Sequence, residues 1–225
     1  FGSPLFLRQL AAFEEEEETR VNLPKAIAKR VATLPADACR LLNTLAVAGR
    51  PLPLALAARV ADIEQDAPGI VSRLRAETLV RTRGVDASGE VEIYHDRIRD
   101  IVMKGLPPEE AKRLHMKLGR ALSAEGDAAD AEAIATHFKL ADQVALAAQY
   151  AEKAADRASN ALAFGRAAAM YEMAIELQSG ASEGSSEGSD VLLLKLAEAL
   201  VSAGRNREAA DRFLQMAEGA SPMDA

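Results

Sequence analysis

The side chains that could do chemistry in this 225-residue chain are few, and the most distinctive run is Tyr94-His95-Asp96. An imidazole can hydrogen-bond a phosphate oxygen or a nearby backbone group, and an aspartate can cap a helix. The other histidines, His115 and His137, are far apart in the sequence and lack the spacing of a metal motif. We therefore expect both to pack within helices, and we predict no catalytic residue and no metal ligand.

The chain also lacks two other kinds of reactive site. Its single cysteine, Cys39, lies on the apolar face of a predicted helix, which is typical of a buried structural thiol. One cysteine forms no internal disulfide and favours a reducing compartment, so we expect a cytoplasmic protein, without any membrane association. No glycine-rich loop ends in Lys-Ser or Lys-Thr. We therefore expect no cofactor in this fragment and no enzymatic activity of its own.

Charge argues against nucleic acid as a partner. The net charge is −7, and the acidic excess lies in residues 106–225, whereas residues 35–105 hold equal numbers of acidic and basic side chains. Neither segment offers the excess of positive charge that attracts a phosphate backbone. DNA contact stays as an alternative because one predicted helix and the strand after it carry four exposed arginines. These are Arg73, Arg75, Arg81 and Arg83.

Hydrophobic spacing divides the chain into three parts, all mainly helical. Residues 1–34 read as a helical linker: an apolar helix over residues 4–17, ending in the acidic run Glu14–Glu18, and a second helix from Pro24. Glu14–Glu18 are expected to be a solvated helix end. Only 4% of the residues are aromatic, so alanine and leucine must supply the core, and this favours closely packed helices.

Residues 35–105 are predicted to form three helices followed by a β-hairpin. Asp37 is expected to cap the first helix, whose apolar residues recur at helical spacing. The period then changes to that of strands over residues 78–83 and 91–94, with a turn-forming segment between them. A further helix over residues 97–104 follows the hairpin. This order is typical of a winged helix.

Residues 106–225 repeat themselves. Leu118-Gly119, Ala154-Ala155 and Leu196-Ala197 occupy equivalent places, separated by 36 and then 42 residues. These steps are close to the period of tetratricopeptide repeats, and the longer one contains a Gly- and Ser-rich stretch, residues 179–189, expected to be flexible. Phe138 stands where the template has a small residue. The prediction is a tetratricopeptide-like α-solenoid.

Taken together, the chain resembles the C-terminal part of the STAND class of signal-transduction ATPases, as found in multidomain bacterial regulators. Three stretches carry the resemblance. Gly2-Ser3-Pro4 is similar to the Gly-x-Pro motif behind the nucleotide-binding fold, residues 94–102 are similar to the aromatic-His-Asp junction, and residues 114–175 resemble the helical repeats.

The resemblance implies a cofactor and two ligand-facing residues. In the family the motif proline packs on adenine and the histidine reaches the ADP phosphates, so it implies that Pro4 and His95 face the ADP or ATP of an upstream ATPase domain that this fragment lacks. Two structural interpretations remain open. Pro4 could simply begin a helix, and His95 could only hydrogen-bond across the strand–helix junction, with Asp96 as the cap of the next helix.

The expected function follows from this resemblance. Residues 1–34 would link to the ATPase, the winged helix at 35–105 would lock the ADP state, and the repeats at 106–225 would receive a protein or peptide signal. Three alternatives stay open: a transcription regulator that reads DNA through the winged helix, the sensor region of a Ser/Thr kinase, and a plain repeat scaffold.

Overall fold

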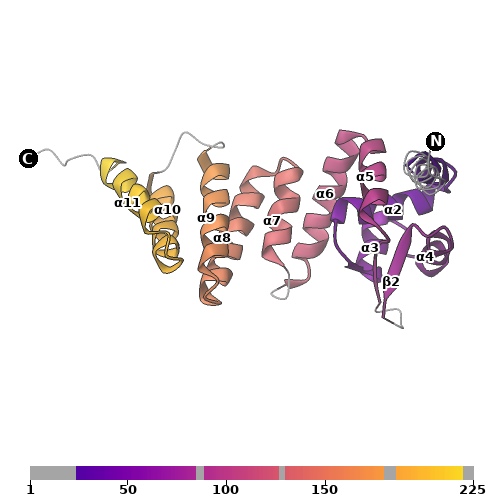
Figure 1. Ribbon diagram of the computed structural model, residues 1–225, viewed down its shortest axis with the longest axis horizontal. Helices are drawn as coiled ribbons and strands as arrows, with labels where there is room; N and C mark the ends of the chain where they lie inside the picture. The colour runs from indigo at the N-terminus through magenta and orange to yellow at the C-terminus, as the bar shows by residue number, and fades with distance from the viewer. Residues whose placement is uncertain (1–23, 85–88, 127–129, 180–185, 220–225) are drawn as a thin grey trace, which may run out of the picture. The chain divides into compact units, whose positions relative to one another are not determined.

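The computed structural model describes residues 24–84, 89–126, 130–179 and 186–219, and the chain divides into two compact units, Phe1–Leu114 and His115–Ala225 (Figure 1). The protein is mainly helical and has a small three-stranded antiparallel sheet, which confirms the coarse fold class predicted from the sequence. The helix expected over residues 4–17 lies outside the described residues, as does Pro4. Across the described ranges, every helix is too short or too polar to span a lipid bilayer.

The first unit consists of short helices around the small sheet. After a helix over residues 24–32, α2 spans Ala36–Ala48, α3 spans Leu54–Ala61, α4 spans Ala67–Ala76 and α5 spans Asp96–Gly105. Helix α2 is central, since it packs against α3, α4, α5 and strand β3. Its Leu41, Leu42 and Leu45 are buried, as their helical spacing predicts. Burial of these leucines removes apolar surface from water and is the main force that holds the unit together.

The sheet contains one strand more than the predicted hairpin. Strands β2 (Val80–Arg83) and β3 (Glu90–Ile93) pair antiparallel, as expected, and β1 (Leu52–Pro53) pairs with the other edge of β3. Leu52 lies opposite Val91, and both side chains are buried. The sheet thus connects the loop after α2 to the strand that leads into α5.

The start of α2 differs from the prediction. The helix begins at Ala36, and Pro35 occupies the N-cap position without a side-chain hydrogen bond. Asp37, expected to be the cap, lies inside the first turn, where its Oδ1 accepts a hydrogen bond from the backbone N–H of Ala38 at 2.7 Å. The carboxylate still faces the positive end of the helix dipole.

The second unit consists of helices that pack on one another in chain order. Helix α6 (Pro108–Ser123) crosses the division between the units, and it is followed by α7 (Ala131–Leu140), α8 (Val144–Asn160), α9 (Phe164–Ser179), α10 (Ser186–Ser202) and α11 (Asn206–Gly219). From α7 onwards each helix packs against the next (Figure 1). The segment expected to be flexible is partly helical, because α9 continues to Ser179 and α10 begins at Ser186.

Small residues set the spacing of these helices. The buried residues of α8 are all alanines, and Ala167, Ala174 and Ala197 are fully buried in α9 and α10. Gly119 likewise allows α6 and α7 to approach closely, because a Cβ added at this position would lie 2.9 Å from Cε1 of Phe138. The aromatic ring thus fits where the repeat template has a small residue because the facing position has no side chain.

A polar cluster joins α8, α9 and α10. Lys195 Nζ lies 2.9 Å from Glu152 Oε1 and 3.1 Å from Asp156 Oδ1, and the Tyr171 hydroxyl donates to the same Asp156 oxygen at 2.6 Å. Burial, together with the hydrogen bond to the neighbouring carboxylate, raises the pKa of Tyr171. The ammonium also lies 5.9 Å from the centre of the Tyr171 ring. These contacts fix the register of three successive helices.

Candidate functional site

His95 lies at the junction between β3 and α5, as the sequence indicates. Its backbone is extended, and its Nδ1 accepts a hydrogen bond from the backbone N–H of Arg97 at 3.1 Å, so His95 is the N-cap of α5. The alternative assignment of the cap to Asp96 is therefore wrong, because the helix already includes Asp96. A neutral imidazole that accepts at Nδ1 carries its proton on Nε2.

The imidazole is exposed, and so is its neighbour Tyr94, which is 49% exposed. Nδ1 caps helix α5 by accepting the hydrogen bond from Arg97, while the Nε2–H group is a donor of the kind that binds a phosphate or carbonyl oxygen. His95 thus has an exposed Nε2–H group, as a ligand-facing histidine requires, and an Nδ1 that is hydrogen-bonded to the backbone, as a structural histidine requires. The two interpretations of His95 are not exclusive.

His95 lines a hollow of about 320 Å³ in the first unit. Helix α2 contributes its C-terminal end, β2 and β3 contribute their side chains, and α5 contributes its first turn. The lining residues are Leu45, Gly49, Arg50, Pro51, Arg81, Glu92, Ile93, Tyr94, His95, Asp96 and Arg99. Three guanidinium groups and two carboxylates meet here, so the hollow is slightly positive and suited to an anionic ligand.

Arg99 is held in place at the wall of this hollow. Its Nε donates to the backbone carbonyl of Ala46 at 2.9 Å, where the last turn of α2 leaves carbonyl groups unsatisfied. Gly49, with φ of 64°, ends α2 in the left-handed conformation, and a Cβ there would lie 3.1 Å from an Arg99 guanidinium nitrogen. Glycine is therefore required twice at this position, for the backbone angle and for the space.

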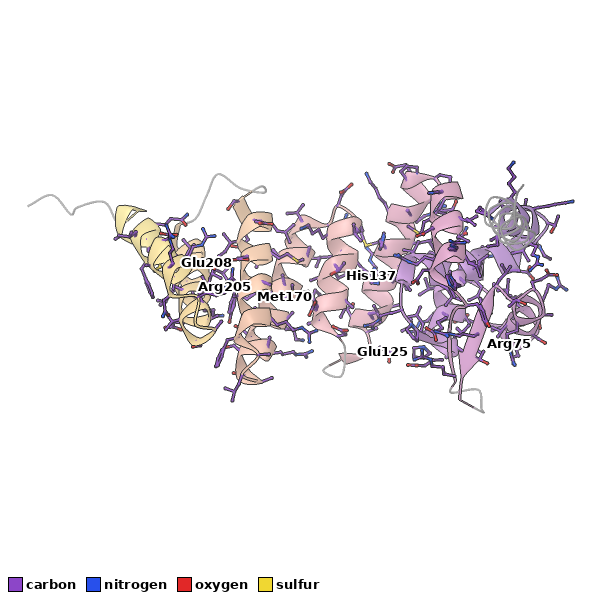
Figure 2. The ribbon with its side chains drawn as sticks, in the orientation of Figure 1. Arg75, Glu125, His137, Met170, Arg205 and Glu208 are labelled. Atoms are coloured by element: carbon purple, nitrogen blue, oxygen red, sulfur yellow. The ribbon has the colours of Figure 1, made fainter. Side chains whose placement is uncertain are left out.

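Two of the four arginines that could have contacted DNA are occupied by one carboxylate. Arg81 Nε lies 2.8 Å and Arg83 Nε 2.9 Å from Glu92 Oε1. Arg73 and Arg75 are exposed on α4 (Figure 2 labels Arg75). Sharing a carboxylate reduces the positive potential of the hairpin, which lowers its attraction for phosphates.

The histidines that we expected to be separate packing residues are in fact in direct contact. His115 on α6 and His137 on α7 are both buried, and their Nδ1 atoms lie 2.9 Å apart. Their ring centres are 5.1 Å apart. The sequence separation hid this pair because only the packing of α6 on α7 brings the two rings together. Among the described residues, no group of three His, Cys, Asp or Glu side chains could hold a metal ion.

Sequence reasoning missed Arg50 and Arg99 as members of the hollow. Arg50 follows the glycine that ends α2, and its Nε is buried. Arg99 lies one helical turn after His95, so it shares a face of α5 with it, and this spacing was the signal that could have identified it. Cys39, predicted to be structural, is half-buried near two backbone carbonyls, and burial raises the pKa of its thiol.

A second hollow, of about 220 Å³, lies in the second unit among α7, α8 and α9. Alanines line it together with two acidic and two basic side chains: Asp130, Glu132, Arg157 and Arg166. Arg166 is paired with Glu132. The alanine side chains are small and leave space in the hollow, and the charged side chains make part of its lining polar.

Comparison of the chain with family models, with curated proteins and with solved structures finds no match, so the assignment of function depends on the geometry described above.

Proposed function

We propose that this chain is the regulatory and protein-interaction region of a nucleotide-switch signalling ATPase of the STAND class. The observation that carries the proposal is His95, exposed at a hollow that also contains Arg50 and Arg99. An Nε2–H donor beside guanidinium groups matches the oxygen atoms of an ADP phosphate. The ADP would be presented by an ATPase domain that precedes this chain.

The first unit would be a winged helix that closes on this nucleotide. The order of α2, β1, α3, α4, β2 and β3 supports that assignment, because the helices precede a hairpin and the hairpin leads into a further helix. The same hairpin carries β3 directly into His95. In the resting state the unit would contact ADP, and exchange of the nucleotide would release it.

The second unit would receive the signal as a tetratricopeptide-like arm. The small residues of α8, α9 and α10 support this assignment, as does the alanine-lined hollow among α7, α8 and α9. A peptide or helix from a partner protein fits such a surface. For the arm to act as a switch, the partner must bind the closed and released states with different affinities.

This proposal predicts that the chain alone binds neither ATP nor ADP at micromolar concentrations. The described hollow supplies donors for phosphates, but the sequence has no phosphate-binding loop to enclose them. Isothermal calorimetry with each nucleotide would measure this directly. Micromolar binding to the isolated chain would contradict the proposal that a separate ATPase domain holds the nucleotide.

The transcription-regulator alternative makes the opposite prediction about DNA. We expect weak binding without sequence preference, because residues 35–105 have no net charge and Glu92 pairs with two of the arginines. Gel-shift titration at physiological salt measures this. A nanomolar, sequence-dependent shift that is lost in the Arg73→Ala/Arg75→Ala double variant would favour the DNA-reading role over our proposal.

The coding sequence upstream of Phe1 separates the remaining alternatives. A Walker-type phosphate loop there would support the proposal, and a Ser/Thr kinase core ahead of that loop would make this chain the sensor region of a kinase. If neither is found, the plain repeat scaffold becomes the better interpretation.

A further inference from the structure

Five exposed basic side chains lie at one end of the first unit, where the helix over residues 24–32 meets α4. The contact between the two helices is a hydrogen bond from Arg30 Nη1 to the backbone carbonyl of Glu77, the C-cap residue of α4, at 3.3 Å. Neither the proposed nucleotide role nor the peptide role uses these cations. We call them the basic surface, and they are Lys25, Lys29 and Arg30 on the first helix and Arg73 and Arg75 in the last turn of α4.

The cations of the basic surface are unpaired in the part of the chain that the structure describes. Residues 24–33 and 70–78 contain a single carboxylate, that of Glu77. None of the five cations forms an ion pair with another described residue, whereas Arg81 and Arg83 share Glu92. A group of exposed, unpaired cations creates a positive potential that attracts an anionic ligand.

The positions of the two lysines carry a local electrostatic cost. Lys25 lies in the first turn of its helix, where the helix dipole disfavours a cation. Lys29 follows four residues later on the same face, so the two ammonium groups repel each other. The arginines differ, since the last turn of α4 favours cations. An anion beside the first turn of the helix over residues 24–32 would reduce both costs.

The sequence contains such an anion a short distance upstream. Glu14–Glu18 are five consecutive carboxylates, and they lie outside the described residues. Six residues separate Glu18 from Lys25, and Arg20 is the one charged residue among them. A connection of this length spans at most about 25 Å. The helix over residues 24–32 is roughly 13 Å long, so the whole helix is within reach of the acidic run.

We propose that the basic surface is a docking site for an acidic segment, and that Glu14–Glu18 of the same chain occupy it. The match is electrostatic, because five carboxylates meet five cations that have no other counter-charge among the described residues. Docking gives the acidic run a partner, in place of the solvated helix end expected from the sequence. The docked run also competes with any other polyanion, DNA included, for the arginines of α4.

Carbodiimide cross-linking of the full chain tests this contact, because the reagent joins a carboxylate to an amine that touches it. The double variant Arg73→Lys/Arg75→Lys keeps both charges and supplies amines on α4. At low salt we expect a cross-link within one chain from Glu14–Glu18 to an introduced lysine, identified by mass spectrometry. Its yield should fall about fivefold or more in about 1 M salt, where the Debye length is ~3 Å.

Lys104, which is exposed on α5, is the internal control and should not be joined to the acidic run. Cross-linking to Lys104 at the same yield would overturn the proposal, because a freely moving run reaches both lysines. Absence of the α4 cross-link would overturn it too, and so would cross-links confined to dimers, since the occupant would then be a second copy of the chain.

DNA binding gives an independent measurement on the same surface. Changing all five residues of the run, Glu14–Glu18, to glutamine should raise the affinity for DNA about tenfold at about 50 mM salt, because the competing carboxylates are gone. Adding Arg73→Ala/Arg75→Ala should cancel this rise. A rise that persists in the combined variant would show a general effect of net charge and contradict the docking, as would the absence of any rise.

Discussion

His95→Ala is expected to weaken the retention of ADP about tenfold or more in a protein that joins this chain to the proposed ATPase domain, and to raise basal signalling. The physical reason is the loss of one donor to a charged phosphate, since such hydrogen bonds contribute about 1.5–3 kcal/mol. Fluorescence measurement of the rate at which a labelled ADP dissociates would test this. An unchanged dissociation rate would assign His95 a purely structural role.

The helix cap offers a way to separate the two roles of His95. His95→Ala also removes the acceptor of the Arg97 N–H group, and loss of an N-cap costs about 1 kcal/mol of stability. His95→Asn keeps a capping oxygen and should leave the stability of the chain nearly unchanged. If both variants lose ADP to the same extent, the imidazole contacts the nucleotide. Loss in His95→Ala alone would mean that the effect comes from fraying of α5.

Ala197→Leu is expected to destabilise the second unit by about 1–3 kcal/mol, because the larger side chain overfills a closely packed site. Ala197 is fully buried on α10, a helix that packs against both α9 and α11. Chemical unfolding followed by circular dichroism measures the change. The affinity for a peptide ligand should also fall, since the spacing of the helices sets the shape of the binding surface.

Ala210→Leu on α11 is the matched control for this substitution. It makes the same change of side chain in a neighbouring helix, but Ala210 is exposed, so the added atoms meet no packed neighbour. Its stability should stay within about 0.5 kcal/mol of the original. Equal stabilities for the two variants would mean that Ala197 is not at a close approach between helices.

Helical and strand periodicity predicted most elements of the first unit because each is determined by its own residues. The leucines of α2 recur at the spacing of one helix face, and β2 and β3 alternate on either side of a turn-forming segment. Strand β1 was missed because two residues are too few to show any alternation. Leu52 and Pro53 adopt strand geometry through pairing with β3, which lies far along the chain.

The predicted positions of the helix caps were less accurate, because a helix start depends on the backbone angles of one or two residues. Asp37 and Asp96 are both good capping residues, so from residue type alone we expected a cap at Asp37 and kept Asp96 as an alternative cap of the next helix. The caps are in fact Pro35 and His95, because α2 begins at Ala36, one residue before Asp37, and α5 begins at Asp96 itself. Where a helix starts depends on the preceding turn or strand, and the type of the capping side chain is only a weak guide to it.

The sequence by itself determined the mainly helical class, the buried faces of the helices and the position of His95 at a strand–helix junction. These follow from contacts within a few residues, which the order of side chains dictates directly. Only the tertiary structure decided that Arg50 and Arg99 share a hollow with His95, that Gly119 makes room for Phe138, and that His115 meets His137. Each of these contacts joins two elements that are separate in the sequence. No local sequence pattern determines which residue of one element meets which residue of the other.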